Sequence, residues 1–462
     1  MSNIKTPIIP PHQQFAKVAA PQELDHKAIC IFAATGFFLD TDTYWKNKKV
    51  LPAASENTLD EDGFLIESKP WFQWHYSPRD ISFETALEEF TSLFEQIIAK
   101  QIKDNKVILP LSGGLDSRTQ AVALAKLKKE VTAYSYSFKG GYSESAIGKK
   151  IAKASNFDFK EFTIEQGYLW PKLETLAYIN GCYSEFTHPR QLAILDELKK
   201  MEGIFSLGHW GDVLFDRGAP EGTKDDNLLE IVLKKIVKKG GMELATALWQ
   251  EWNLEGDFES YFRERIASLL NNIKIANPSA KLRAFKSMYW APRWTSVNLS
   301  VFEAAHAITL PYYDDRMCEF ICTMPEEFLA DRKLQIAYIK QQNPDLAKIT
   351  WQDHKPFNLY TFEKNTTPNN LPYRIANKLK REVRSKMGKP YIQRNWELQF
   401  LGLDNDEKLQ QWLFGDNLHP FISKPLLARF YNNFKTMDSV TYSHPLSILL
   451  TLAIWHKNRE NG

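Results

Sequence analysis

The spacing of hydrophobic and polar residues divides the chain into three parts. Residues 1–28 are polar and rich in proline, which predicts an extended arm. Between residues 29 and 76, short apolar runs such as 29–33 and 63–66 are separated by Gly, Pro, Asn and Asp, a pattern typical of short strands. We therefore expect residues 1–78 to form an arm and a small β module.

The pattern changes to longer elements after residue 80. Ser82 precedes a helical repeat of apolar residues that includes Ala86 and Phe90 and continues to Gln101. Apolar strands are then expected at 106–111, 131–138, 157–164 and 203–207, with helices at 119–129 and 143–154. Strands that alternate with helices predict an α/β core with a doubly wound parallel sheet, which we place at residues 79–227.

From about Leu228 the pattern is helical almost to the end of the chain. We expect residues 228–462 to form a large α-helical part that completes the active site. The longest apolar stretch runs from Pro445 to Trp455, which is shorter than the roughly 20 residues that span a bilayer. It therefore predicts a buried helix.

Composition and net charge limit the classes of molecule that this protein is expected to bind. The 462 residues include 58 Lys and Arg against 56 Asp and Glu, so net charge gives no case for binding nucleic acid or a membrane. The four cysteines, Cys30, Cys182, Cys318 and Cys322, lack the spacing of a zinc site and are expected to be buried, reduced thiols. No signal peptide pattern begins the sequence, so we expect a cytoplasmic protein.

One charged run interrupts this balance. Residues 374–394 carry eight basic residues and one acidic residue in a mostly helical stretch. Such a run can dock a carrier, a nucleic acid or a glycan lipid, but it is more often a solvated helix face. Because the overall charge is near zero, we favour the solvated face.

The strongest chemical signal is the sequence Ser-Gly-Gly-Leu-Asp-Ser at 112–117, between a predicted strand and a predicted helix. Gly113 and Gly114 allow a sharp turn that brings backbone N–H groups close to an anion, and the helix adds its positive end. Ser112 and Ser117 can donate to phosphate oxygens. Asp116 fits such a site only beside a cation such as Mg²⁺. The sequence lacks the Walker A and Rossmann patterns here. It predicts a phosphate or pyrophosphate loop rather than a plain tight turn.

This loop resembles the pyrophosphate loop of the ATP pyrophosphatases, and Leu-Ser-Gly-Gly-Leu-Asp-Ser-Arg at 111–118 is similar to the asparagine synthetase type. Four further segments resemble that family in the same order, namely 78–90, 207–215, 310–314 and 331–335, the last followed by 343–348. The resemblance covers about residues 30–455. It implies the ATP pyrophosphatase fold, which is HUP-like.

The resemblance also implies roles for individual residues. Those that contact ATP or pyrophosphate are Leu111, Ser112, Gly113, Gly114, Asp116, Ser117, Tyr136 and Gly208. Asp116 and Asp212 are the implied metal ligands. Lys333 is implied to stabilise the charge that develops on the acyl-adenylate and the departing phosphate.

The sequence departs from the family at its beginning. Asparagine synthetases start with a glutaminase domain whose nucleophile is an N-terminal cysteine, whereas Ser2 follows Met1 here. Residues 35–43 and 50–52 resemble only the tail of that domain. We expect a small N-terminal β remnant without glutamine hydrolysis. Ammonia then comes from solution or from a separate glutaminase, unless another amine is the acceptor.

The segment 207–215 departs as well. Trp210 replaces a glycine of the family and Val213 replaces a glutamate. His209 stands where asparagine synthetases carry Glu and where β-lactam-forming relatives carry a catalytic Tyr. It is either a general base for the amine or a contact residue.

Further candidates for the substrate pocket are His188, Glu303 and Asp314, with His306 nearby. Residues of these types are more often structural.

Three hypotheses follow. The first is an ATP- and Mg²⁺-dependent ligase that adenylates a small-molecule carboxylate and forms an amide with ammonia or another amine. Aspartate is the nearest substrate, and a lactam, a precursor peptide or a sugar acid are alternatives. The second is a non-catalytic ATP-binding scaffold. The third, a tRNA- or nucleotide-modifying enzyme, is disfavoured because the chain lacks catalytic cysteine spacing and a basic domain.

Overall fold

The computed structural model describes residues 1–142, 145–187, 189–415 and 421–460. Its centre is a five-stranded sheet in which all neighbouring strands are parallel. The strand order is β10 (Ile308–Thr309), β9 (Ile204–Ser206), β6 (Val107–Pro110), β7 (Val131–Phe138) and β8 (Asp158–Ile164). The predicted α/β fold class with a parallel sheet is confirmed.

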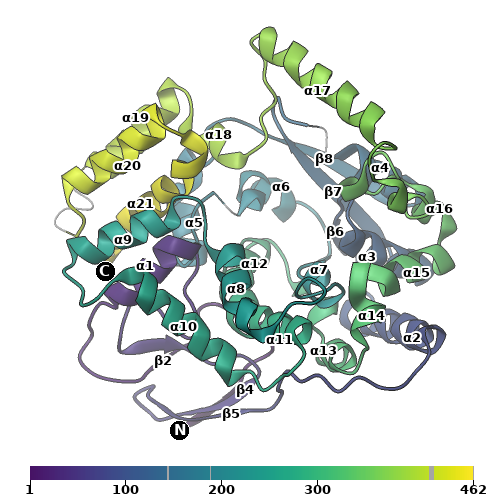
Figure 1. Cartoon of the computed structure of the whole chain (residues 1–462), viewed down its shortest axis with the longest axis horizontal. Helices are drawn as coiled ribbons and strands as arrows, with labels where there is room; N and C mark the ends of the chain where they lie inside the picture. The colour runs from purple at the N-terminus through teal and green to yellow at the C-terminus, as the bar shows by residue number, and fades with distance from the viewer. Residues whose placement is uncertain (143–144, 188, 416–420, 461–462) are drawn as a thin grey trace.

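The strands at the centre of the sheet are buried on both faces. Val107, Ile108 and Leu109 of β6 are fully buried, which explains why this strand is an unbroken apolar run. Helices α3 (Leu115–Lys126) and α4 (Ser145–Ala154) pack against the sheet, and α2 (Phe83–Ile102) and α15 (Lys333–Gln342) pack on α3 (Figure 1). The predicted start of α2 is confirmed, because Ser82 accepts a hydrogen bond from the Thr85 N–H at 3.1 Å.

The N-terminal part differs in detail from the prediction. Strands β1 (Ser2–Lys5), β4 (Ser55–Leu59) and β5 (Leu65–Pro70) form an antiparallel sheet, and β2 (Phe15–Lys17) pairs with β3 (Lys48–Val50). The expected arm therefore contains two strands. Residues 29–33 lie in a helix, α1 (His26–Thr35), and not in a strand. Because α1 is buried against α9, its apolar residues form a run without helical spacing, which is easily mistaken for a strand.

Short helices connect β8 to the second half of the chain. They are α5 (Leu173–Asn180), α6 (Leu195–Lys199) and α7 (Gly211–Leu214). The helices of the second half are α8 (Leu228–Ile236), α9 (Gly241–Glu251), α10 (Phe258–Asn272), α11 (Pro278–Phe285), α12 (Ser296–Glu303), α13 (Asp315–Cys322), α14 (Glu326–Leu329), α16 (Pro344–Lys348), α17 (Leu371–Lys386), α18 (Asn395–Phe400), α19 (Leu403–Phe414), α20 (Lys424–Thr436) and α21 (Ser439–Glu460), together with α15. A π-helical turn at Lys286–Thr295 joins α11 to α12.

The helical half also contributes to the sheet. Strand β10 at the sheet edge comes from residues beyond 228, and sequence analysis missed it because it has only two residues. One hydrophobic core extends through all three parts of the chain. The boundaries at residues 78 and 227 stay predictions.

Two further expectations concern burial and membrane spans. Cys30, Cys182, Cys318 and Cys322 are free and buried, as predicted. Within the described ranges, no helix has the length and apolar character needed to cross a bilayer.

Candidate active site

A pocket of about 310 Å³ lies at the carboxyl ends of β6 and β7. Ligands of open α/β sheets bind at this edge. Its walls are Pro110, Leu111, Ser112, Gly114, Asp116, Ser117, Tyr134, Ser135, Tyr136, Gln191, Leu207, Gly208, His209 and Phe302. Of the ten residues that the family resemblance assigns to ATP, metal or the general base, eight line this pocket, and Gly113 and Asp212 do not.

Hydrogen bonds within the loop between β6 and α3 involve both of its serines. The Ser112 N–H donates to the Ser117 hydroxyl at 3.2 Å, and the Gly114 N–H donates to the Ser112 hydroxyl at 3.2 Å. Helix α3 begins at Leu115, so its positive end points toward the loop. The loop therefore has the hydroxyl groups and the helix terminus of an anion site.

Gly113 is engaged by a distant residue. Its N–H donates to the Gln352 side-chain oxygen at 3.0 Å, and its carbonyl accepts from the Gln352 N–H at 3.0 Å. A Cβ atom at Gly113 would lie 2.8 Å from that same oxygen, so this position requires glycine while Gln352 stays in place. The buried Arg118 strengthens the link, because it donates to the carbonyls of Gly113 and Thr350 at 3.1 and 2.7 Å.

Asp116 is the charged centre of the pocket. Its Oδ1 atom forms an ion pair with Arg332 and accepts from the Gln335 side-chain amide at 3.2 Å. The Tyr312 hydroxyl donates to the Asp116 carbonyl at 3.0 Å and accepts from Gln335 at 3.0 Å. These contacts tie the loop to residues 312–335 of the helical half, which therefore completes the site.

The surroundings of Asp116 fit a divalent cation. Burial raises the pKa of the Asp116 carboxyl to about 6, while Arg332 opposes this shift and the negative charge of Asp212 adds to it. A second positive charge would relieve the repulsion between Asp116 and Asp212. Two carboxylates with phosphate oxygens form the ligand set that Mg²⁺ prefers, and Asp212 is exposed and able to join it. Within the described ranges, no group of three or more His, Cys, Asp or Glu side chains forms a fuller metal site.

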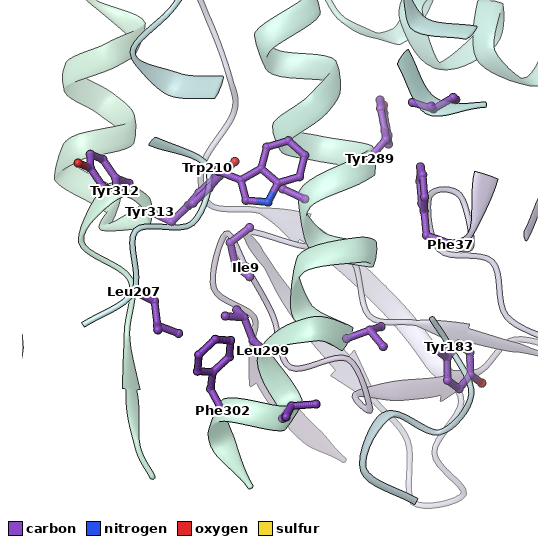
Figure 2. Close-up of a cluster of buried hydrophobic side chains, with 14 of the residues drawn as sticks. Ile9, Phe37, Tyr183, Leu207, Trp210, Tyr289, Leu299, Phe302, Tyr312 and Tyr313 are labelled. Carbon is purple, nitrogen blue, oxygen red and sulfur yellow. The ribbon is translucent and has the colours of Figure 1, made fainter. Parts of the chain in front are cut away.

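The second loop keeps a backbone shape that favours glycine. Trp210, which replaces a glycine of the resemblance, has a φ of 65°, in the left-handed region. Its ring lies in the hydrophobic core (Figure 2). The indole N–H bonds Thr295, and the ring packs edge-on against Trp290 with 5.4 Å between ring centroids. The next residue must be glycine, because a Cβ at Gly211 would lie 2.4 Å from Asp116 Oδ1.

His209 lines the pocket and packs edge-on against Phe302, with 5.6 Å between ring centroids. Its Nδ1 atom is buried without a hydrogen-bond partner in the described structure. Burial lowers the pKa of His209 to about 4, although Asp212 opposes this shift. The imidazole is therefore neutral at pH 7, and burial makes it a weaker base than a solvated histidine.

The remaining predicted residues lie elsewhere. Lys333 is exposed and donates to the Glu327 carbonyl at 3.1 Å, whereas its neighbour Arg332 reaches Asp116. Asp314 caps α13 and pairs with Arg316 at 2.9 Å. Glu303 is exposed on α12, next to the pocket residue Phe302.

Two histidine candidates remain. His306 bonds the Leu198 carbonyl at 2.8 Å, which is a structural contact. His188 lies outside the described residues.

Sequence analysis missed several residues that contact the site. Gln191 and Phe302 line the pocket, and no local motif marks them. Tyr312 and Arg332 belong to segments that carry the family resemblance. The sequence therefore identified these segments but not the side chains in them that contact the site. Gln352 lies more than two hundred residues from the loop, and only the tertiary structure reveals it.

The parallel sheet and the loop after β6 define an α/β protein with a strand–loop–helix motif at the sheet edge. A family model described as asparagine synthase matches residues 89–457. Because this is more than half of the 462 residues, the chain belongs to the asparagine synthase family. None of the curated proteins compared matches the sequence. Among solved structures, NMN synthetase from Francisella tularensis is 16% identical over 45% of this chain and 93% of that chain, with a TM-score of 0.23.

Membership of this family supports an ATP-dependent amide-forming ligase that acts on a small-molecule carboxylate and an amine.

Proposed function

We propose that this protein adenylates a carboxylate such as aspartate and passes the acyl group to ammonia or another amine. The observation that carries the proposal is the position of Asp116, at the mouth of an anion-binding loop and beside Asp212. A half-buried carboxylate in a phosphate site has a clear purpose when it binds the metal of MgATP.

The reaction has two steps. The substrate carboxylate oxygen attacks the α-phosphorus of ATP, which forms an acyl-adenylate and releases pyrophosphate. The amine then attacks the acyl carbon, AMP leaves, and the amine loses one proton. Ser112, Gly114 and Ser117 bind the phosphate oxygens, and Mg²⁺ held by Asp116 and Asp212 would neutralise their charge. Leu111 and Tyr136 lie in the pocket wall where the adenosine packs.

Arg332 and His209 have separate tasks in this proposal. Arg332 pairs with Asp116 and would add positive charge beside the phosphates, while Asp116 and Asp212 would hold Mg²⁺. His209, which is neutral at pH 7, accepts the proton of the amine. The role predicted for Lys333 requires its side chain to leave the Glu327 carbonyl.

The experiment is a product analysis. The protein is incubated with ATP, Mg²⁺, aspartate and ammonium, and then with lactam precursors, peptides and sugar acids in place of aspartate. Formation of AMP, pyrophosphate and the matching amide supports the proposal. The amine donor is tested by replacing ammonium with glutamine in a parallel reaction.

A second candidate is a non-catalytic ATP-binding scaffold. It is favoured by the engagement of both Gly113 and Asp116 by protein side chains, since these groups would otherwise face phosphate and metal. ATP binding without AMP formation for any carboxylate and amine supports this candidate and contradicts the ligase.

A further inference from the structure

Helix α17 (Leu371–Lys386) differs from the other long helices because none of its residues is buried. Its apolar residues nevertheless follow a strict spacing of four. Leu371, Ile375, Leu379 and Val383, with Met387 just after the helix, are between 43% and 68% exposed. We call these five residues the α17 stripe. Apolar side chains that gather on one exposed helix face mark an interaction surface rather than a solvated face.

The structure fixes the direction in which the stripe points. The less exposed residues of α17 are Tyr373, Asn377 and Arg384, which share one face because successive residues turn by about 100°. The stripe occupies the opposite face. Helix α17 therefore turns its polar face toward the protein and its apolar face away from it. Figure 1 shows the helix at the rim of the molecule, joined to it by a loop at each end.

Contacts at the C-terminal end of α17 hold it in this orientation. The Arg384 guanidinium lies 4.0 Å from the centre of the Tyr391 ring, and its Nε donates to the Lys389 carbonyl at 3.1 Å. Tyr391 stacks on Tyr142 with 4.2 Å between centroids. Ile392 bridges Gly141, just beyond the end of β7 where Tyr136 lines the pocket. The helix is thus anchored at the same sheet edge as the active site.

The charged residues of α17 are almost all basic. The helix contains six basic residues, Arg374, Lys378, Lys380, Arg381, Arg384 and Lys386, and one acidic residue, Glu382. At about 100° per residue, Lys378 and Lys380 flank the stripe on either side, and Glu382 and Lys386 lie between its apolar residues near the C-terminal end. An apolar face bordered by Lys and Arg is the pattern of a helix that lies in the interface of an anionic membrane.

We propose that the α17 stripe docks this protein peripherally on a bilayer that contains anionic phospholipid. A second copy of the chain is a poor occupant, because two such helices would bring like charges together. An acidic helical peptide is the other partner of matching charge, and vesicle binding distinguishes it from a bilayer. The net charge of the chain gave no sign of this surface, since it averages over the whole sequence.

Vesicle co-sedimentation of the full-length protein tests the proposal. We expect binding to vesicles of phosphatidylcholine with phosphatidylglycerol, weaker binding to phosphatidylcholine alone, and loss of binding at high salt. The double variant Ile375→Gln and Leu379→Gln should bind at least about tenfold more weakly. Leu403→Gln is the matched control, because Leu403 is an exposed leucine on α19 (84%).

The variant should keep its fold, since both side chains are exposed, and its circular dichroism spectrum and thermal midpoint should equal those of Leu403→Gln. Equal binding to both vesicle types, equal binding of the double variant and wild type, or no binding at any lipid composition would overturn the proposal. In the last case an acidic protein partner becomes the alternative occupant.

Discussion

Gln352 bonds both backbone polar groups of Gly113, at 3.0 Å on each side, and so spans the loop where phosphate is expected to bind. The amide oxygen of Gln352 takes a donor that the loop would otherwise offer to ATP. We infer that phosphate binding exchanges this contact for a contact with the nucleotide.

The first prediction concerns this exchange. Gln352→Ala removes the competing acceptor, and a hydrogen bond of this kind contributes about 1 kcal/mol, so ATP should bind about fivefold more tightly. Calorimetric titration with MgATP measures the change. Weaker binding by Gln352→Ala would mean that the side chain supports the nucleotide instead of competing with it.

The second prediction separates two neighbouring basic residues. Arg332 pairs with Asp116, whereas Lys333 contacts only a carbonyl at the surface. Arg332→Ala should lower kcat/KM at least about 100-fold, because it removes the positive charge beside Asp116 that we propose stabilises the phosphates. Lys333→Ala should change it by less than about threefold. A larger loss in Lys333→Ala than in Arg332→Ala would restore the role predicted for Lys333 from sequence.

The third prediction is the pH dependence of MgATP binding. Burial raises the pKa of Asp116 from 3.8 to about 6, so the carboxylate is protonated below pH 6 and no longer binds a metal. MgATP affinity should be steady above about pH 7 and fall by up to about tenfold per pH unit below 6. Binding to Asp116→Asn should be weak and should lack this dependence. An Asp116→Asn titration that matches the wild type over pH 5–8 would contradict the assignment of the metal ligand.

The fourth prediction assigns His209 to the second step. Because burial lowers the pKa of His209 from 6.5 to about 4, its neutral form persists from pH 8 down to about pH 5. The rate of amide formation should therefore fall only as the pH approaches 4, and not near pH 6.5. His209→Asn should retain adenylation and lose most amide formation, by about 100-fold. A quench-flow experiment that follows AMP formation and amide formation separately checks this, and equal losses in both steps would show that His209 only shapes the pocket.

Local sequence was sufficient for the parts of the site that form within one segment. The loop at 112–117 was predicted because glycines, serines and an aspartate between a strand and a helix are together typical of a phosphate-binding loop. The sheet was predicted from strands such as β7, which covers 131–138 as expected. The predictions that were wrong concern elements whose structure depends on packing against distant residues. Residues 29–33 are helical because α9 covers them, and no spacing in the run itself shows this.

The choice between Arg332 and Lys333 illustrates a second limit. Asp331 and Arg332 both have left-handed backbone angles, with φ of 58° and 62°. These two residues come directly before α15. The Arg332 side chain points into the protein and contacts Asp116, whereas Lys333, the first residue of the helix, is exposed. Residue types alone do not reveal such a reversal, because non-glycine residues rarely adopt this conformation. Gln352 shows the same limit at long range.

Exchange of radioactive pyrophosphate into ATP tests the central claim most directly, because it reports reversible adenylation without the amine. We predict exchange that requires Mg²⁺ and one class of carboxylate, and that falls at least about 100-fold in Asp116→Asn. Exchange that is absent with every carboxylate, or that is unchanged in Asp116→Asn, would contradict the account of this site as an adenylating ligase.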